Sequence, residues 1–378
     1  MSWSFKVMTV RGIPIRIHIS FLLILLWAGY SGLVSSRGSW PRSVLFMVAF
    51  VLLLFVCVVL HELGHSLMAQ LFGVRVQDIT LWPIGGVARI ARLPETPLAE
   101  FLITAAGPAV NVALAAGLGA LALLWIGPRQ MLTILSSPWL LERFLATMDL
   151  QALLVLLVAN NIILVVFNLL PAFPMDGGRL LRSFLAAFLP FQQATRVASA
   201  VGQGLAIVIG AGALVSGNLL LALVGVFVFM AAWQERQQVA LSDNLRGLRV
   251  RQAMQPIGLR LYPLQTLGEA AAQIATSPQA AFLVVDAGRL VGLLTRKDLL
   301  TAIRRAGPWA TVGQHLRRDI VRLHPDTLLV NAQEQLQRGQ AMVGIVVDQD
   351  RVIGTLSLWD LARLAELLAA HPEVLPRG

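Results

Sequence analysis

The most constraining feature of the sequence is an uncharged apolar run from Val44 to Leu60, which ends in a His-Glu-Leu-Gly-His motif at residues 61–65. On a helix the two histidines lie at positions i and i+4, so both imidazoles can reach one metal ion. Glu62 lies between them and can act as a base on water held by that metal. Because such side chains are costly at membrane depth, their presence there indicates a functional site.

Composition places much of the chain in lipid. Of its 378 residues 57% are hydrophobic and only 13% are charged, and the mean hydropathy is +0.73, whereas soluble domains carry about 25% charge. The net charge of +10 comes largely from arginines that flank apolar segments, which indicates anionic lipid and topology and no nucleic-acid partner. The single cysteine, Cys57, cannot form an intrachain disulfide. We expect no cleavable signal peptide, since the first apolar segment lacks a small-x-small site.

The apolar segments predict a polytopic α-helical membrane protein with about six transmembrane helices. Each segment approaches the roughly 20 residues that a helix needs to cross a bilayer. Lysine and arginine are dense before the first span and in every second loop after it, which places both termini in the cytoplasm. The predicted spans cover about residues 18–35, 43–72, 97–126, 148–170, 196–214 and 218–234.

Between the second and third spans the sequence predicts a short β-hairpin at the inner membrane surface. Residues 74–81 alternate imperfectly between apolar and polar side chains, and the Gly85-Gly86 pair then turns the chain into residues 87–90. An irregular interfacial loop is the alternative. The mixed stretch 129–147 is expected in the outer interface.

After Trp233 charged residues become frequent, which predicts a linker over residues 239–252 that leads into a soluble domain. That domain contains an internal repeat, because residues 292–299 correspond to residues 354–361 at an offset of 62 that many other positions share. Each copy has the order helix, strand, turn, strand, helix. In the first copy these elements are Leu267–Thr276, Ala281–Asp286, Leu290–Leu294 and Lys297–Arg304.

The predicted organisation is therefore a membrane domain over residues 1–238, a linker over 239–252 and a soluble α/β domain over 253–378. The two repeats of the soluble domain cover about residues 253–306 and 313–368.

Two histidines do not complete a catalytic zinc site, which typically has three protein ligands and one open position. The other histidines lie at the start of the first span or in the soluble tail, so we expect a carboxylate of the membrane half. Asp176 is the candidate, because prolines 171 and 174 break the fourth span, and Gly177 and Gly178 let the chain reorient. Spans two and four both run from outside to inside, so the two motifs can meet at one depth. A solvated turn carboxylate at the helix end is the alternative for Asp176.

Two motifs carry a family resemblance. The motif at residues 61–65, with Asn-x-x-Pro-x-x-Pro-x-Asp-Gly at 168–177, resembles the site-2 protease family of intramembrane zinc metalloproteases. Gly-Pro-Ala-Val-Asn at 107–111 looks like the middle motif of that family, and the resemblance covers roughly residues 10–235.

The resemblance implies that Zn²⁺ is bound by His61, His65 and Asp176, and that Glu62 is the general base and acid. It also implies that Asn111 and Asn168 orient the substrate or the transition state. For both asparagines, helix-packing hydrogen bonds are an equal alternative.

The same resemblance implies single-pass membrane proteins as substrates. A transmembrane helix hides its carbonyls in intrahelical bonds, so the substrate must unwind, and the hairpin with Gly85 and Gly86 can hold it as an added strand. We therefore expect a multi-pass protein of a prokaryotic cell (inner) membrane.

The tail resembles a tandem pair of cystathionine-β-synthase-type (CBS) modules over about residues 253–368. In that family a Gly-x-x-Thr/Ser-x-x-Asp motif contacts adenine nucleotides such as ATP, ADP or AMP. CBS pairs of the family usually pack head-to-head, so the resemblance implies a homodimer. Helix capping without nucleotide is the alternative reading. The corresponding nucleotide-binding candidates are Thr295, Asp298, Ser357 and Asp360.

These features favour an intramembrane zinc endopeptidase modulated by a cytosolic CBS pair. A channel or transporter with regulatory CBS domains is the alternative from another class, but a transport pathway has no need of the glutamate in the His-Glu-x-x-His motif. An inactive relative is less favoured, because all the expected ligands are present.

Overall fold

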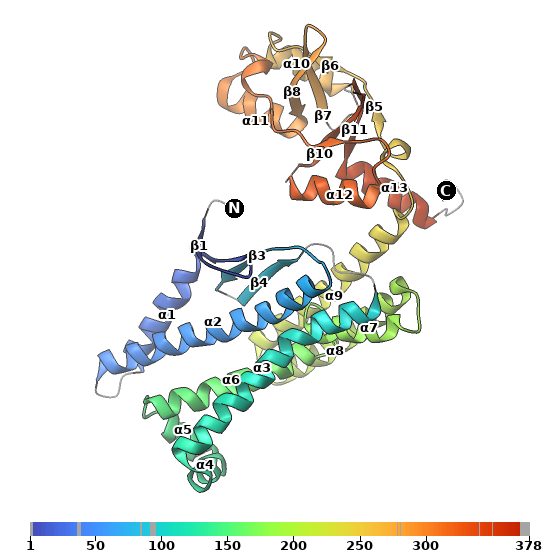
Figure 1. The fold of residues 1–378 in the computed structure, drawn as a ribbon. Coiled ribbons are helices and arrows are strands. Elements are labelled where there is room, and N and C mark those ends of the chain that lie inside the picture. The colour runs from blue at the N-terminus through green and yellow to red at the C-terminus, as the bar shows by residue number, and fades with distance from the viewer. Residues whose placement is uncertain are drawn as a thin grey trace. The chain divides into compact units, whose positions relative to one another are not determined.

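The computed structural model describes residues 3–35, 39–83, 85–90, 96–277, 279, 281–339, 341–349 and 351–370. The chain divides into two compact units, Met1–Arg236 and Gln237–Gly378. Within the described residues the first unit is a helical bundle with a small sheet, and the second unit is an α/β domain (Figure 1).

Five helices of the described chain are long and apolar enough to cross a membrane. The sequence analysis expected about six spans, and the first of them is the shorter apolar helix α1, Phe21–Val34. Helices dominate because the backbone groups of a spanning segment must be hydrogen-bonded within that segment. The five long helices are α2 (Trp40–Leu71), α3 (Pro97–Ile126), α6 (Leu150–Leu169), α8 (Phe191–Val215) and α9 (Leu219–Asn244).

Helix α3 is the centre of the bundle. It packs against α2 on one side and α6 on another, and also against the shorter helix α7, Asp176–Ala186 (Figure 1). The predicted outer interface segment forms two short amphipathic helices, α4 (Pro128–Leu135) and α5 (Pro138–Leu145).

A four-stranded sheet packs on α2 through its strands β3 and β4. The strand order is β1-β2-β3-β4, in which β2 and β3 are parallel and the other neighbours are antiparallel. The predicted hairpin is β3–β4, but Gly85 and Gly86, which were predicted to form its turn, pair with Trp82 and Leu81 as part of β4. The N-terminal hairpin β1–β2 was not predicted. The strands are β1 (Ser4–Val10), β2 (Ile13–His18), β3 (Val76–Trp82) and β4 (Gly85–Ile90).

The sequence does contain a local signal for the N-terminal hairpin, the Arg11-Gly12 pair. Arg11 and Gly12 both have positive φ, 46° and 83°, and form the kind of two-residue turn that joins antiparallel strands. Ile13 and Ile15, which alternate with less buried residues, are buried beneath the sheet.

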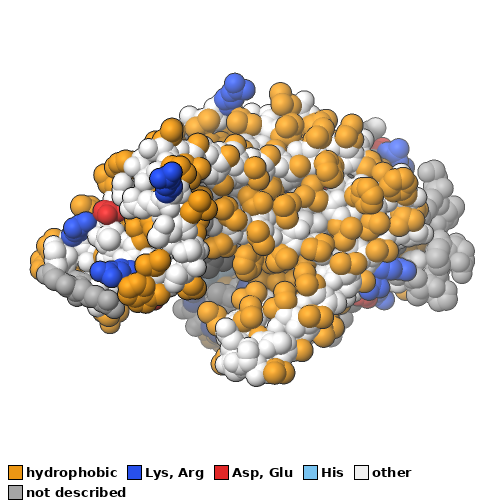
Figure 2. All heavy atoms as spheres, turned by 90° about the horizontal axis from the view of Figure 1, so that it is seen from below, with side chains coloured by type: hydrophobic (Ala, Val, Ile, Leu, Met, Phe, Trp, Pro, Cys, Tyr) orange, Lys and Arg blue, Asp and Glu red, His pale blue; other side chains and the backbone are white. Residues whose placement is uncertain are grey.

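The surface of the first unit is strongly apolar. Figure 2 shows one face covered largely by hydrophobic side chains, with few charged groups among them. Exposed large apolar side chains occur on every long helix, for example Leu53, Leu124 and Phe227. Contiguous apolar surface on this scale is expected where lipid replaces water.

The second unit consists of two copies of one motif, as the repeat predicts. Strand β7 (Ala281–Asp286) recurs as β10 (Val343–Asp348), and β8 (Arg289–Thr295) recurs as β11 (Arg351–Ser357). Each copy has its own apolar core, and a third cluster joins the copies through side chains of β7, β8 and β10. The helices are α10 (Leu267–Ala275), α11 (Arg296–Ala306), α12 (Leu329–Arg338) and α13 (Leu358–Ala370), and the short strands are β5 (Gln255–Pro256), β6 (Arg260–Leu261) and β9 (Arg322–Leu323).

The stretch predicted as a linker, residues 239–252, is part of this folded domain. Helix α9 continues to Asn244, and Leu245, Leu248 and Val250 are then buried in the core of the second repeat. Burial of these apolar side chains stabilises the packing of the segment against the domain. The many charged residues around them led the sequence analysis to predict a linker instead.

Candidate functional site

Helix α2 carries the His-Glu-x-x-His motif in its C-terminal third. His61 and His65 are both buried, and their Nε2 atoms lie 3.1 Å apart. This approach follows from the i, i+4 spacing, which places both side chains on one face of the helix.

Asp176 meets the two histidines from a distant part of the chain. Its Oδ2 lies 3.3 Å from Nε2 of His61 and 3.2 Å from Nε2 of His65. The aspartate is the first residue of α7, after a loop that ends α6. A Cβ on Gly177 would lie 2.2 Å from the carbonyl oxygen of Leu170, so only glycine permits this close packing.

The tautomer of His65 is fixed by its surroundings. Its Nδ1 lies 2.8 Å from the carbonyl oxygen of Ile103 in α3, so Nδ1 donates and Nε2 keeps its lone pair for a ligand. Position 107 of α3 must be glycine, because a Cβ there would lie 2.2 Å from His65 Nε2. The Nδ1 of His61 is buried without a hydrogen-bond partner among the described residues.

The three donor atoms fit a zinc ion. A tetrahedral zinc with bonds of about 2.0–2.2 Å separates neighbouring ligand atoms by roughly 3.3 Å, and the three atoms here are 3.1–3.3 Å apart. Two imidazole nitrogens and one carboxylate oxygen are a typical donor set for catalytic zinc. The separations and the donor types therefore both match a zinc site.

Glu62 lies between the histidines and faces strand β4. A Cβ on Gly86 would lie 3.0 Å from Glu62 Cγ, and the carboxylate also interacts with the backbone amide of Ala88. Glu62 is therefore close both to the three donor atoms and to the strand that forms one end of the sheet.

The other predicted polar residues have different environments. Asn111 is fully buried, and neither its side-chain oxygen nor its nitrogen has a hydrogen-bond partner among the described residues. Asn168 is half-buried near the end of α6. The sequence analysis missed Asn161, which is fully buried and whose side-chain nitrogen lies 3.4 Å from Cys57 Sγ. Only its position among apolar residues of a span could have signalled it.

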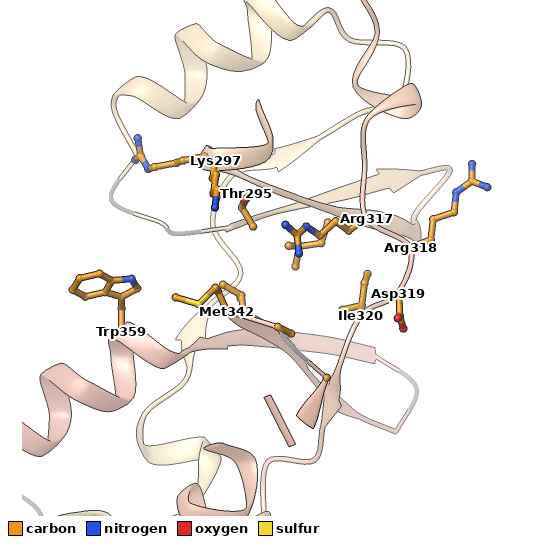
Figure 3. A pocket seen from close by; sticks show the side chains of 13 residues that line it. Thr295, Lys297, Arg317, Arg318, Asp319, Ile320, Met342 and Trp359 are labelled. Atoms are coloured by element: carbon orange, nitrogen blue, oxygen red, sulfur yellow. The ribbon is translucent and has the colours of Figure 1, made fainter. Parts of the chain in front are cut away.

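In the second unit a cavity of about 860 Å³ lies between the two repeats. Of the predicted nucleotide-binding residues, Thr295 lines this cavity, together with basic residues that were not predicted, Lys297, Arg317 and Arg318 (Figure 3). The Lys297 side chain extends into the cavity beside Thr295, and Trp359 approaches from the opposite wall (Figure 3).

The carboxylate of Asp298 is already paired. Arg317 donates two hydrogen bonds to it, each 2.8 Å long, and the Thr295 hydroxyl donates a third of 2.6 Å. Burial raises the pKa of Asp298, but the bonds from Arg317 and Thr295 outweigh burial and hold that pKa below its usual range. Ser357 and Asp360 repeat the helix-capping arrangement in the second copy.

The chain has apolar helices that can span a membrane, and its His-Glu-x-x-His motif meets a distant aspartate. Together these two features define a membrane-embedded metalloprotease. Comparison with known proteins gives the family. Residues 49–210 match the model of peptidase family M50, and residues 250–305 and 312–366 match the CBS domain. The chain belongs to peptidase family M50, the site-2 protease family, and is a multi-pass zinc metalloprotease with a tandem pair of CBS domains.

Individual relatives agree with this assignment. The chain is 29% identical to zinc metalloprotease MJ0392 of Methanocaldococcus jannaschii over 374 residues, which cover 99% of each chain. It is 30% identical to stage IV sporulation protein FB of Bacillus subtilis over 148 residues, 39% of this chain and 44% of that protein. Among solved structures it is similar to the site-2 protease from Methanocaldococcus jannaschii, with 34% identity, a TM-score of 0.43, and coverage of 62% of this chain and 95% of that one. The family models and the zinc metalloprotease relative confirm the predicted family and enzyme class, and the spanning helices followed by the α/β tail confirm the predicted fold class.

Proposed function

We propose that the protein is an intramembrane endopeptidase that cleaves transmembrane segments of single-pass membrane proteins. The observation that carries this proposal is the convergence of Asp176 with His61 and His65, which lie with Glu62 on a helix long and apolar enough to span the membrane. The arginine and lysine bias of the loops supports a prokaryotic cell (inner) membrane location with both termini in the cytoplasm.

In the proposed mechanism His61, His65 and Asp176 hold the metal. A zinc ion bound there supplies a Lewis acid that polarises the scissile carbonyl and makes water more acidic. Glu62 takes a proton from the attacking water and returns it to the leaving nitrogen. Glu62 follows His61 directly on α2, and its carboxylate lies near the three donor atoms.

We propose that an unwound substrate segment pairs with strand β4. In the described sheet β4 has a neighbour on one side only, β3, and its residues Gly86 and Ala88 lie against Glu62. Backbone pairing would expose the substrate carbonyls without requiring particular side chains. Gly85, whose φ is +142°, and Gly86 leave room for that segment.

Asn111 and Asn168 are proposed to orient the substrate or the transition state. The support for Asn111 is its buried amide group, which has no protein partner among the described residues and is therefore available to a bound peptide. The support for Asn168 is its position eight residues before Asp176, at the end of the helix that leads into the ligand loop.

For the CBS pair we propose binding of an adenine nucleotide (ATP, ADP or AMP) that modulates proteolysis. The cavity of about 860 Å³ has the size of a small-molecule site, and Lys297 and Arg318 offer positive charge to phosphates. Because Asp298 is bonded to Arg317, we assign phosphate recognition to the basic residues and to Thr295, with Ser357 and Asp360 as the matching groups of the second repeat. We also propose a homodimer through the CBS modules, membrane lipid contacts and no nucleic-acid partner.

The decisive experiment compares the wild type with Glu62→Gln in purified full-length protein. We expect the variant to keep one equivalent of zinc and to lose cleavage of a model transmembrane substrate. A chelator should abolish wild-type cleavage, and added zinc should restore it. The transporter alternative predicts instead that Glu62→Gln leaves a measured flux in vesicles largely unchanged and that neither form cleaves the substrate.

A further inference from the structure

A buried arginine that the proposed mechanism does not use lies on the helix that begins with Asp176. Arg182 of α7 is 4% exposed, although it carries a full charge within the membrane unit. Its Nε donates a hydrogen bond of 2.9 Å to Glu100 of α3, and its Nη2 contacts the same carboxylate oxygen. Its Nη1 donates a hydrogen bond of 2.5 Å to Glu235 of α9.

Two aromatic rings enclose the same guanidinium. The carbon Cζ of Arg182 lies 5.2 Å from the ring centre of Phe173 and 4.9 Å from that of Phe191. Phe173, which is 1% exposed, belongs to the loop that precedes Asp176, and Phe191 is the first residue of α8. A single side chain therefore holds α7 to α3, α8 and α9 and also contacts the loop.

The planar guanidinium of Arg182 fixes the directions of its hydrogen bonds as well as their lengths. It presents donors along set directions to two carboxylates at once, which a point charge cannot do. Because an unpaired charge in this buried setting is strongly unfavourable, the three charged groups restrict one another to this arrangement.

Helix α7 connects this arrangement rigidly to the metal site. Arg182 is six residues beyond Asp176, about 9 Å along the helix at 1.5 Å per residue. The first turn of α7 is tightly packed, because a Cβ on Gly178 would lie 2.7 Å from the backbone of Ala172. A rotation of α7 at Arg182 would therefore move the Asp176 carboxylate relative to the histidines of α2.

We propose that Arg182 is a positioning residue for the metal centre, and that Glu100 and Glu235 fix it so that Asp176 meets His61 and His65. This inference rests on the proposed function, in which Asp176 is a metal ligand. It assigns a role in metal binding to three charged residues that do not contact the metal site.

The test uses the full-length protein loaded with Co²⁺, whose visible absorption reports the ligands and their geometry. Glu235→Gln removes the charge of one of the two carboxylates that bind Arg182 but keeps the shape of the side chain. Arg182→Lys keeps the positive charge but loses the planar guanidinium. We expect both variants to change the cobalt spectrum and to weaken metal affinity by about 10-fold, the usual effect of losing a group that orients a metal ligand. Arg236→Gln, at an exposed neighbouring position of α9, is the matched control and should change neither.

A purely structural role would lower the melting temperature and leave the cobalt spectrum of the folded protein unchanged. Wild-type spectrum and affinity in folded Glu235→Gln would therefore overturn the proposal, even if Arg182→Lys does not fold. Asp176→Asn separates this result from failure of the proposed function. If Asp176→Asn keeps wild-type metal affinity, then Asp176 is not a ligand and the proposed metal site itself is wrong.

Discussion

The imidazole of His65 lies directly against the backbone of Gly107, so closely that a methyl group at position 107 would overlap Nε2 at 2.2 Å. The neighbouring carbonyl of Ile103 accepts the hydrogen bond of His65 Nδ1. Helix α3 thus sets the orientation of a proposed zinc ligand by the absence of one side chain and the position of one carbonyl.

Gly107→Ala is therefore expected to displace His65 and to weaken zinc binding by about 100-fold, the upper end of the effect of disturbing a ligand's support. Zinc content and a competitive chelator titration of the purified protein measure this. Gly117→Ala on the same helix is the matched control, because no atom lies within 4 Å of a Cβ there. Equal zinc affinity in the two variants would show that α3 does not constrain His65.

Gly86→Ala should reduce cleavage while zinc stays bound. The added Cβ would lie 3.0 Å from Glu62 Cγ and 3.1 Å from Val58 Cγ1, tighter than ordinary contact. Displacement of a catalytic group by a fraction of an ångström to 1 Å costs roughly 10- to 100-fold in rate, so we expect a loss of about 10-fold in kcat. Val87→Ala, on an exposed side chain of the same strand, serves as the control, and a similar loss there would point to a general disturbance of β4.

The pairing of Asp298 with Arg317 makes the stability of the CBS pair depend on pH. The folded-state pKa of Asp298 is lowered from the ordinary value of 3.8, so its contribution is fully present above that value. The contribution is lost as the pH falls through the still lower folded-state pKa. Asp298→Asn should cost about 1 kcal/mol at pH 7, and the difference from wild type should shrink below about pH 4.

Thermal unfolding of the wild type and Asp298→Asn between pH 7 and pH 3 measures this difference. Asp360→Asn is the matched control, since Asp360 caps its helix in the same way but faces the neutral Gln255 at 3.4 Å. We expect a smaller cost for Asp360→Asn. Equal costs for both variants at pH 7 would mean that the arginine contributes no stability.

Lys297→Ala should weaken ATP binding by about 10-fold, equivalent to about 1.4 kcal/mol, because it removes a cation that lines the cavity between the repeats. Calorimetric titration of ATP into the full-length protein measures the affinity. Arg304→Ala removes a cation from an exposed position of the same helix, outside the cavity, and should leave the affinity unchanged. If Lys297→Ala binds ATP as the wild type does, the phosphates lie elsewhere.

The structure reproduces much of what local pattern predicted. The first four spans recur within about three residues, and α3 begins and ends where the apolar run does, because a bilayer requires a continuous apolar helix. Helices α8 (Phe191–Val215) and α9 (Leu219–Asn244) extend further than the predicted spans 196–214 and 218–234. The repeat in the tail appears as strands at the same offset, β7 with β10 and β8 with β11. The N-terminal hairpin was missed because short strands beside a basic segment resemble an interfacial loop.

By itself the sequence determined that two histidines lie one turn apart directly after an apolar helical run, because helical periodicity fixes neighbours four residues apart. It also supplied Asp176 as the distant partner. Only the tertiary structure decided how these groups meet: at 3.2–3.3 Å, with Gly107 against His65 and Arg182 held between two glutamates. Such contacts join residues far apart in the chain, and their distances depend on how whole helices pack, which no local pattern specifies.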